Sequence, residues 1–92
     1  MNIKEIYWRL RGSGYVVDQY NFDKQYLGKK PGYYAYLKST DNAPSIEALM
    51  RLHYKLLETK NIHQTYGVNT GELEELAGGI LCKVKDRCLS VD

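Results

Sequence analysis

The chain has 92 residues, of which 43% are hydrophobic and 26% are charged, and its formal net charge is +2. This length and composition predict a single folded domain over residues 1–92 and exclude an intrinsically disordered chain. Since no segment has the length of a membrane span and the N-terminus lacks the apolar run of a signal peptide, we expect a cytoplasmic protein with no membrane partner.

The charges are unevenly distributed along the chain. Residues 24–60 contain seven Lys and Arg against three acidic residues, a local net charge of +4, whereas residues 61–92 contain three against five, a local net charge of −2. Between Lys24 and Thr40 there is no acidic residue, and lysines and tyrosines are interspersed. The pattern indicates one basic face, which either binds a partner or is an ordinary solvated surface.

The residue types that most often carry catalysis or bind metals show no recognisable pattern. Cys82 and Cys88 are six residues apart, which matches no common zinc-ligand spacing and, at about 600° of rotation on a helix, points the thiols to different faces. We therefore expect reduced thiols. His53 and His63 belong to no catalytic triad pattern, and the chain has no phosphate-binding loop. The sequence predicts no enzymatic activity, no metal and no cofactor.

Hydrophobic periodicity predicts an all-α fold of five helices. The first begins after Asn2, which forms a capping box with Glu5, and ends at a Gly-Ser-Gly sequence. Its apolar stripe consists of Ile3, Ile6, Tyr7 and Leu10. The second helix is predicted over residues 19–26, with Asp18 as its N-cap and Gly28 as its terminator, because glycine adopts the left-handed conformation at little cost.

The third helix is predicted over about residues 31–39, with Pro31 in its first turn. Tyr34 and Leu37 are three residues apart and are expected to face the core, whereas the other two tyrosines of this helix lie on another side. The N-cap position falls on Lys30, although lysine is a poor cap.

The fourth helix is predicted to begin at Pro44-Ser45, with the serine as its cap, and to end at about Thr59. His53 lies on its apolar side, where we expect a packed core residue rather than a ligand. Residues 60–69 are predicted to form a polar connection to the fifth helix.

The segment from the second to the fourth helix resembles the Cro/repressor (XRE) type of helix-turn-helix. The matching features are Asp18-Gln19, Leu27-Gly28, Tyr34 with Leu37, and Pro44-Ser45-Ile46 leading to Leu49. Fifteen residues separate Gly28 from Pro44, as is usual in that family. The resemblance covers residues 18–57 and implies a helix-turn-helix core over about residues 18–59. The segment also resembles a set of small bacterial proteins with an LG…YY.YL…PS.EAL arrangement, which implies a fold but no activity.

The sequence departs from the repressor pattern at two places. The interval from Asp18 to Leu27 is one residue longer than usual. The turn reads Gly-Lys-Lys-Pro-Gly, where the family prefers an apolar residue after the first glycine and a serine cap. Both departures concern the angle at which the third helix is presented.

The resemblance implies a small transcriptional regulator of bacterial or phage origin that binds double-stranded DNA. In such a protein the N-terminal side chains of the third helix reach the base edges in the major groove. Here the side chains in the base-reading, phosphate-binding and flanking positions are Gln19, Lys29, Lys30, Gly32, Tyr33, Tyr36, Lys38 and Asn42. Because the third helix has no Arg, Asn or Gln, we expect modest sequence discrimination.

The same surface also fits a protein partner. Nine of the 92 residues are tyrosine, and tyrosine is enriched in protein interfaces. The alternative hypothesis is therefore a protein-binding module on a helix-turn-helix scaffold, such as a phage-borne inhibitor or an antitoxin-like partner.

The fifth helix is predicted over about residues 70–89 and is longer than a repressor core requires. Gly78 and Gly79 in its middle indicate a kink or the close approach of another helix. We expect this amphipathic helix either to pack across the first helix or to form a two-fold homodimer interface. The residues assigned to that interface are Leu73, Leu76, Ile80 and Val84.

Overall fold

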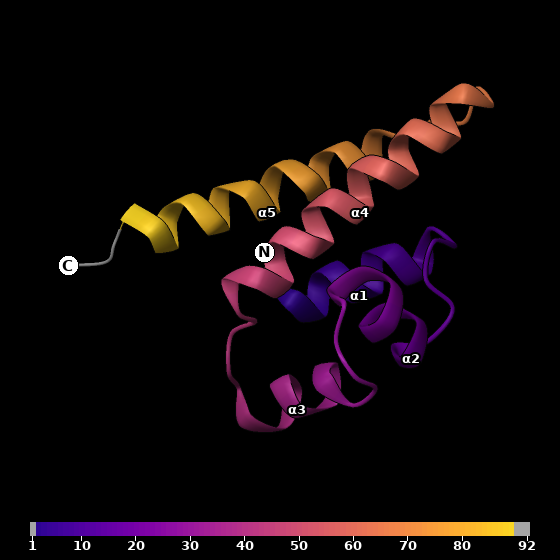
Figure 1. The fold of residues 1–92 in the computed structure, drawn as a ribbon. Coiled ribbons are helices and arrows are strands. Elements are labelled where there is room, and N and C mark those ends of the chain that lie inside the picture. The colour runs from indigo at the N-terminus through magenta and orange to yellow at the C-terminus, as the bar shows by residue number, and fades with distance from the viewer. Residues whose placement is uncertain (1, 90–92) are drawn as a thin grey trace.

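The computed structural model describes residues 2–89, of which about 75% are helical and none forms a strand (Figure 1). The elements are α1 (Ile3–Gly12), α2 (Gln19–Asn21), η1 (Phe22–Leu27), α3 (Tyr33–Thr40), α4 (Ile46–Thr65) and α5 (Gly71–Leu89). Since α2 continues directly into η1, the described chain has five helices. The all-α fold predicted from the sequence is confirmed.

Helix α1 forms as its capping residues predict. The backbone N–H of Glu5 donates to Oδ1 of Asn2 at 2.9 Å, which satisfies one of the free donors of the first turn. The predicted stripe of Ile3, Ile6, Tyr7 and Leu10 is buried. The last helical residue is Gly12, Ser13 is the C-cap, and Gly14 follows in a left-handed conformation.

The second helix begins at the predicted cap but does not stay α-helical. The carboxylate of Asp18 accepts from the N–H of Asn21 at 2.8 Å. From Phe22 to Leu27 the helix is π-helical, a form with i→i+5 hydrogen bonds that is rare and mostly limited to single turns. It ends at Gly28, which has φ +65° as predicted. The hydrophobic pattern predicted an ordinary α-helix here and did not indicate a π turn.

Helix α3 begins at Tyr33, two residues later than predicted. Gly32 has φ +98° and is therefore not helical, so Pro31 lies in the turn before the helix rather than in its first turn. Tyr34 and Leu37 are buried, as predicted. An aromatic cluster joins α3 to the rest of the core: the ring of Tyr34 lies 4.7 Å from that of Tyr7 and 5.5 Å from that of Phe22.

Helix α4 is longer than predicted. It runs to Thr65, so residues 60–65 are helical and the predicted connection is reduced to residues 66–70. The apolar stripe of α4 ends near Thr59, which is why the pattern indicated an earlier end. The extension is supported from α5 instead, because Glu74 accepts from Lys60 at 3.4 Å and from Gln64 at 3.4 Å.

Helix α5 lies antiparallel along α4 (Figure 1). Its N-terminal turn is tied to α1, because Arg9 donates to Glu72 through Nε at 2.6 Å and through Nη2 at 2.9 Å. Nη2 of Arg9 also lies 3.1 Å from Glu75. On the facing side, Nδ1 of His53 lies 3.0 Å from the carbonyl oxygen of Ala77. Within residues 2–89, no helix combines the length and the apolar character that a membrane span needs.

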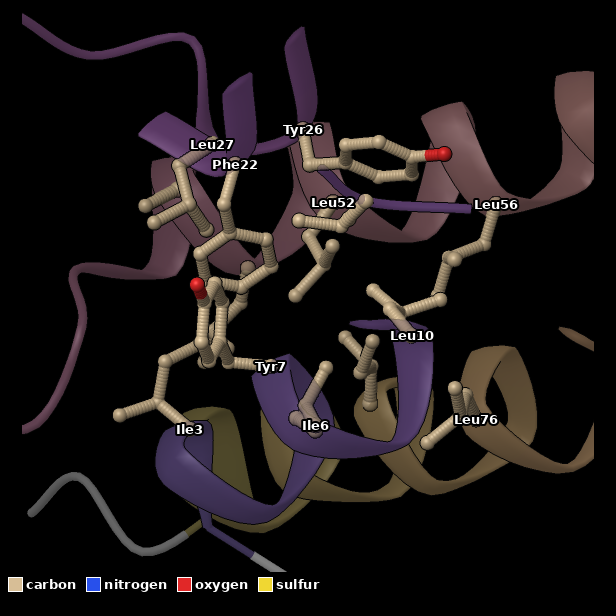
Figure 2. Packing of buried hydrophobic residues seen from close by; sticks show 14 of the residues in the cluster. Ile3, Ile6, Tyr7, Leu10, Phe22, Tyr26, Leu27, Leu52, Leu56 and Leu76 are labelled. Atoms are coloured by element: carbon tan, nitrogen blue, oxygen red, sulfur yellow. The ribbon is translucent and has the colours of Figure 1, made fainter. Parts of the chain in front are cut away.

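The four residues assigned to a dimer interface lie in the core of the monomer, which corrects that assignment. Their exposed fractions are 0% for Leu73, Leu76 and Ile80 and 8% for Val84. Figure 2 shows Leu76 directed toward Ile6 and Leu10 of α1. The amphipathic face of α5 is therefore covered by the chain's own helices, and a second copy would have to use other residues.

Candidate functional site

The turn between η1 and α3 is organised by a buried carboxylate that sequence reasoning missed. Asp23 is 1% exposed. Its Oδ2 accepts from the N–H of Gly32 and its Oδ1 accepts from the N–H of Tyr34, each at 2.9 Å. Asp23 thus caps α3 from the preceding helix, which replaces the cap that Lys30 cannot provide. The absence of a local cap before α3 is the sequence signal that something else must supply one.

This capping role determines the charge of the surface. Asp23 is the last acidic residue before the stretch from Lys24 to Thr40, which contains none. Because its carboxylate is buried and bonded to backbone N–H groups, it is not presented to solvent. The outer surface of the turn and of α3 therefore presents cations and phenols without an exposed carboxylate of its own.

The structure brings four of the predicted residues together around the start of α3. Lys30 and Gly32 are exposed, and Lys29 and Tyr33 are half-buried. The Nζ of Lys29 lies 5.6 Å from the centroid of the Tyr33 ring and 3.7 Å from Glu47 of α4. The Tyr33 hydroxyl accepts from the N–H of Ser45 at 3.1 Å, so Tyr33 also holds the start of α4 in place.

Three more predicted residues lie toward the C-terminal end of α3. Tyr36 is 53% exposed, and its hydroxyl accepts from Nδ2 of Asn42 at 3.2 Å. Lys38 is half-buried with its Nζ 4.7 Å from the centroid of the buried Tyr34 ring. Of the predicted contacts, Lys30, Gly32, Tyr36 and Asn42 are exposed. The last predicted residue, Gln19, is half-buried at the start of α2, outside the group around α3.

The phenol of Tyr34 lies beneath this surface and adds no charge to it. Its hydroxyl is buried and has no hydrogen-bond partner among the described residues. Burial raises the pKa of Tyr34 above the ordinary value for tyrosine, and the neighbouring Tyr7 raises it further. The group is therefore a neutral phenol at neutral pH.

Arg51 of α4 is a second functional candidate that the sequence did not single out. Its side chain crosses Gly28 so closely that a Cβ built on this glycine would overlap Cδ of Arg51. Gly28 has a positive φ, which favours glycine, and a Cβ at this position would also displace the Arg51 side chain. The Nε of Arg51 lies 3.6 Å from Glu47, the carboxylate that also faces Lys29.

The described residues contain no group of side chains placed as a metal centre. No group of three or more His, Cys, Asp and Glu side chains within residues 2–89 is placed to hold a metal ion. Cys82 and Cys88 are both free and exposed on α5. The candidate site is therefore the surface of α3 and of the turn before it, where most of the predicted contact residues lie.

Comparison with known proteins identifies a family but no activity. Searches of the curated proteins and of the solved structures gave no significant match. The model of a family of unknown function, DUF6626, matches residues 3–91. The chain therefore belongs to the DUF6626 family.

Proposed function

We propose that this protein binds double-stranded DNA as a small helix-turn-helix regulator of bacterial or phage origin, with α2–η1 and α3 as the two helices of the motif. The observation that supports this most directly is the buried Asp23 carboxylate. It fixes the tight turn and α3 against the preceding helix while leaving the outer surface basic. A fixed and predominantly basic surface is what a phosphate backbone attracts. One carboxylate lies beside it, that of Glu47 on α4, which is 3.7 Å from Nζ of Lys29.

The geometry assigns different tasks to the residues of this surface. Lys30, Lys29 and the phenol of Tyr36 are suited to phosphate contacts, and the exposed Gly32 permits close approach of the backbone to DNA. The N–H groups of Gly32 and Tyr34 bond to Asp23, and that of Tyr33 bonds to the carbonyl oxygen of Lys30, so these three groups are not available as a phosphate site. Phosphate affinity must then come from the lysines, with modest base discrimination.

Both departures from the repressor pattern have a physical counterpart that supports the proposal. The extra residue between Asp18 and Leu27 falls where the helix is π-helical, and an i→i+5 turn encloses one residue more than an i→i+4 turn. The missing serine cap is replaced by Asp23. Both departures thus involve residues that precede α3, and α3 itself remains a regular α-helix.

The test is the affinity for a short duplex of mixed sequence, measured by fluorescence anisotropy as a function of salt. We expect log K to fall linearly with log salt, with a slope of about −0.9 for each phosphate contact. The double variant Lys29→Glu/Lys30→Glu should abolish binding, and the control Lys85→Glu, a single charge reversal on α5, should not. Circular dichroism checks that both variants are folded. Unchanged binding by the double variant contradicts the proposal.

A protein partner is the second candidate, and the exposure of Tyr36 favours it. A half-exposed tyrosine with an ordered hydroxyl offers a large, stiff contact surface. Tyr36→Ala is the cleaner probe, because Tyr33→Ala would also remove the bond to Ser45. If Tyr36→Ala abolishes function while Lys29→Glu/Lys30→Glu leaves it intact, the surface binds protein.

A further inference from the structure

A second basic surface lies behind the turn, in a groove between η1 and α4. The groove has a volume of about 260 Å³ and is lined by three cations, one carboxylate and two tyrosines. These residues are Lys24, Arg51, Lys55, Glu58, Tyr26 and Tyr54. None of the cations was assigned a role by the sequence pattern, and none belongs to α3.

The cations of the groove retain donors for a ligand. Lys55 pairs with Glu58 at 3.2 Å, and Arg51 faces Glu47 through Nε at 3.6 Å, which leaves its terminal nitrogens for other contacts. Lys24 is exposed and forms no ion pair with any residue of the described range. With three cations and one carboxylate, the lining carries a net charge of +2.

Two unusual backbone features meet at this groove. Lys24 and Tyr26 belong to the π-helical η1, and π turns are rare and frequently found at functional sites. On the opposite wall, the Arg51 side chain passes close over Gly28, where the absence of a Cβ leaves it room. The π-helical η1 and the close passage of Arg51 over Gly28 thus place cations from η1 and α4 around the same groove.

The groove is continuous with the surface of α3. Lys29, next to Gly28 in the turn, and Arg51, in the groove, face the same carboxylate of Glu47 at 3.7 and 3.6 Å. Cations therefore extend from Lys30 through Lys29 and Arg51 to Lys24. At the groove, Tyr54 is 63% exposed and offers a hydroxyl donor or a ring face.

We infer that this groove binds phosphate groups of the DNA backbone and extends the contact of one nucleic acid from α3 onto η1 and α4. The inference rests on the proposed function. The charge complementarity favours a polyanion, and the placement of cations on the turn, on η1 and on α4 favours one with several phosphates. The groove contacts carry no base information and contribute affinity and salt dependence.

The experiment compares the salt dependence of duplex affinity for the wild-type chain, for Lys24→Ala/Arg51→Ala, and for Lys85→Ala. Each lost phosphate contact reduces the salt slope by about 1. We expect the groove variant to lower the slope by about 2 and to weaken binding equally for unrelated duplex sequences, since backbone contacts do not read bases. The control should match the wild-type chain. All substituted residues are exposed, so circular dichroism should show unchanged folding.

The outcomes separate this inference from the proposed function. A groove variant that behaves like Lys85→Ala overturns the inference and leaves the α3 surface unaffected. If the groove variant loses affinity while Lys29→Glu/Lys30→Glu keeps it, the groove is supported and the role of α3 fails. A wild-type chain that binds no duplex overturns both. Displacement of the duplex by polyglutamate but not by single-stranded DNA would show that the groove takes an acidic protein, which also overturns the inference.

Discussion

Replacing Asp23 by alanine tests the most specific feature of the structure. The substitution removes two hydrogen bonds of 2.9 Å from a buried carboxylate to backbone N–H groups. Gly32 is exposed, so water can replace the bond to its N–H. The N–H of Tyr34 is buried, and an unsatisfied buried donor costs about 1–3 kcal/mol. Adding about 1 kcal/mol for the net loss of the bond to Gly32, we expect Asp23→Ala to destabilise the protein by about 2–4 kcal/mol.

Urea denaturation measures this loss, and amide hydrogen exchange locates it. We expect faster exchange at Tyr34 and through the first turn of α3 than in α4, because the lost bonds hold the start of α3. Asp18→Ala is the matched control. It removes a carboxylate cap with one bond of 2.8 Å from an exposed position, and should cost only about 1 kcal/mol. A loss for Asp23→Ala no larger than that of Asp18→Ala would refute the reasoning.

The same variant also separates geometry from charge in DNA binding. Asp23→Ala raises the net charge by one, which by itself should strengthen a phosphate-driven complex. We expect weaker binding, since α3 loses its cap and its fixed position. Stronger binding would mean that the basic charge acts without the geometry of the turn.

Three further predictions concern the core and α5. Leu76 is fully buried, so Leu76→Ala should lower the free energy of unfolding by about 2–5 kcal/mol. The urea midpoint should not depend on protein concentration. A midpoint that depends on concentration would favour a dimer through α5 instead. Gly78→Ala should raise the thermal midpoint, corresponding to a stabilisation of about 1 kcal/mol, because a Cβ there meets nothing within 4 Å. The hydrogen bond from Arg9 lowers the pKa of Glu72, so its stabilisation is present above the ordinary glutamate pKa and is lost as pH falls below it. Glu72→Gln should remove that part of the pH dependence of unfolding, and an unchanged profile would contradict the ion pair.

The parts of the fold that depend on local chemistry could be read from the sequence. The caps at Asn2, Asp18 and Ser45 each accept the hydrogen bond expected of them. Gly28 has the left-handed conformation expected of a helix terminator. In each case the partner is a few residues away, so the pattern contains both members of the interaction.

The features that were missed depend on partners distant in sequence. The last turn of α4 carries no apolar stripe and is supported by Glu74 of α5. Asp23 caps a helix that begins ten residues later, and Arg51 reaches Gly28 from another helix. Gly78, expected to mark a kink or a close contact, lies within a continuous helix and faces open space. Periodicity describes which side of a helix is buried, but not which residue of another element meets it.

The π turn of η1 lies next to the candidate site, and the packing of its residues indicates why. In an α-helix, one extra residue would rotate everything after it by about 100° around the axis. Phe22, Tyr26 and Leu27 cannot accept that rotation, since each is at most 5% exposed and Phe22 also contacts the rings of Tyr7 and Tyr34. Under the proposed function, the residue that is extra relative to the repressor pattern is accommodated by the π turn of η1. That widened turn contains Asp23, which fixes α3, and Lys24, which lines the groove. One local distortion thus positions both proposed contact surfaces relative to the core.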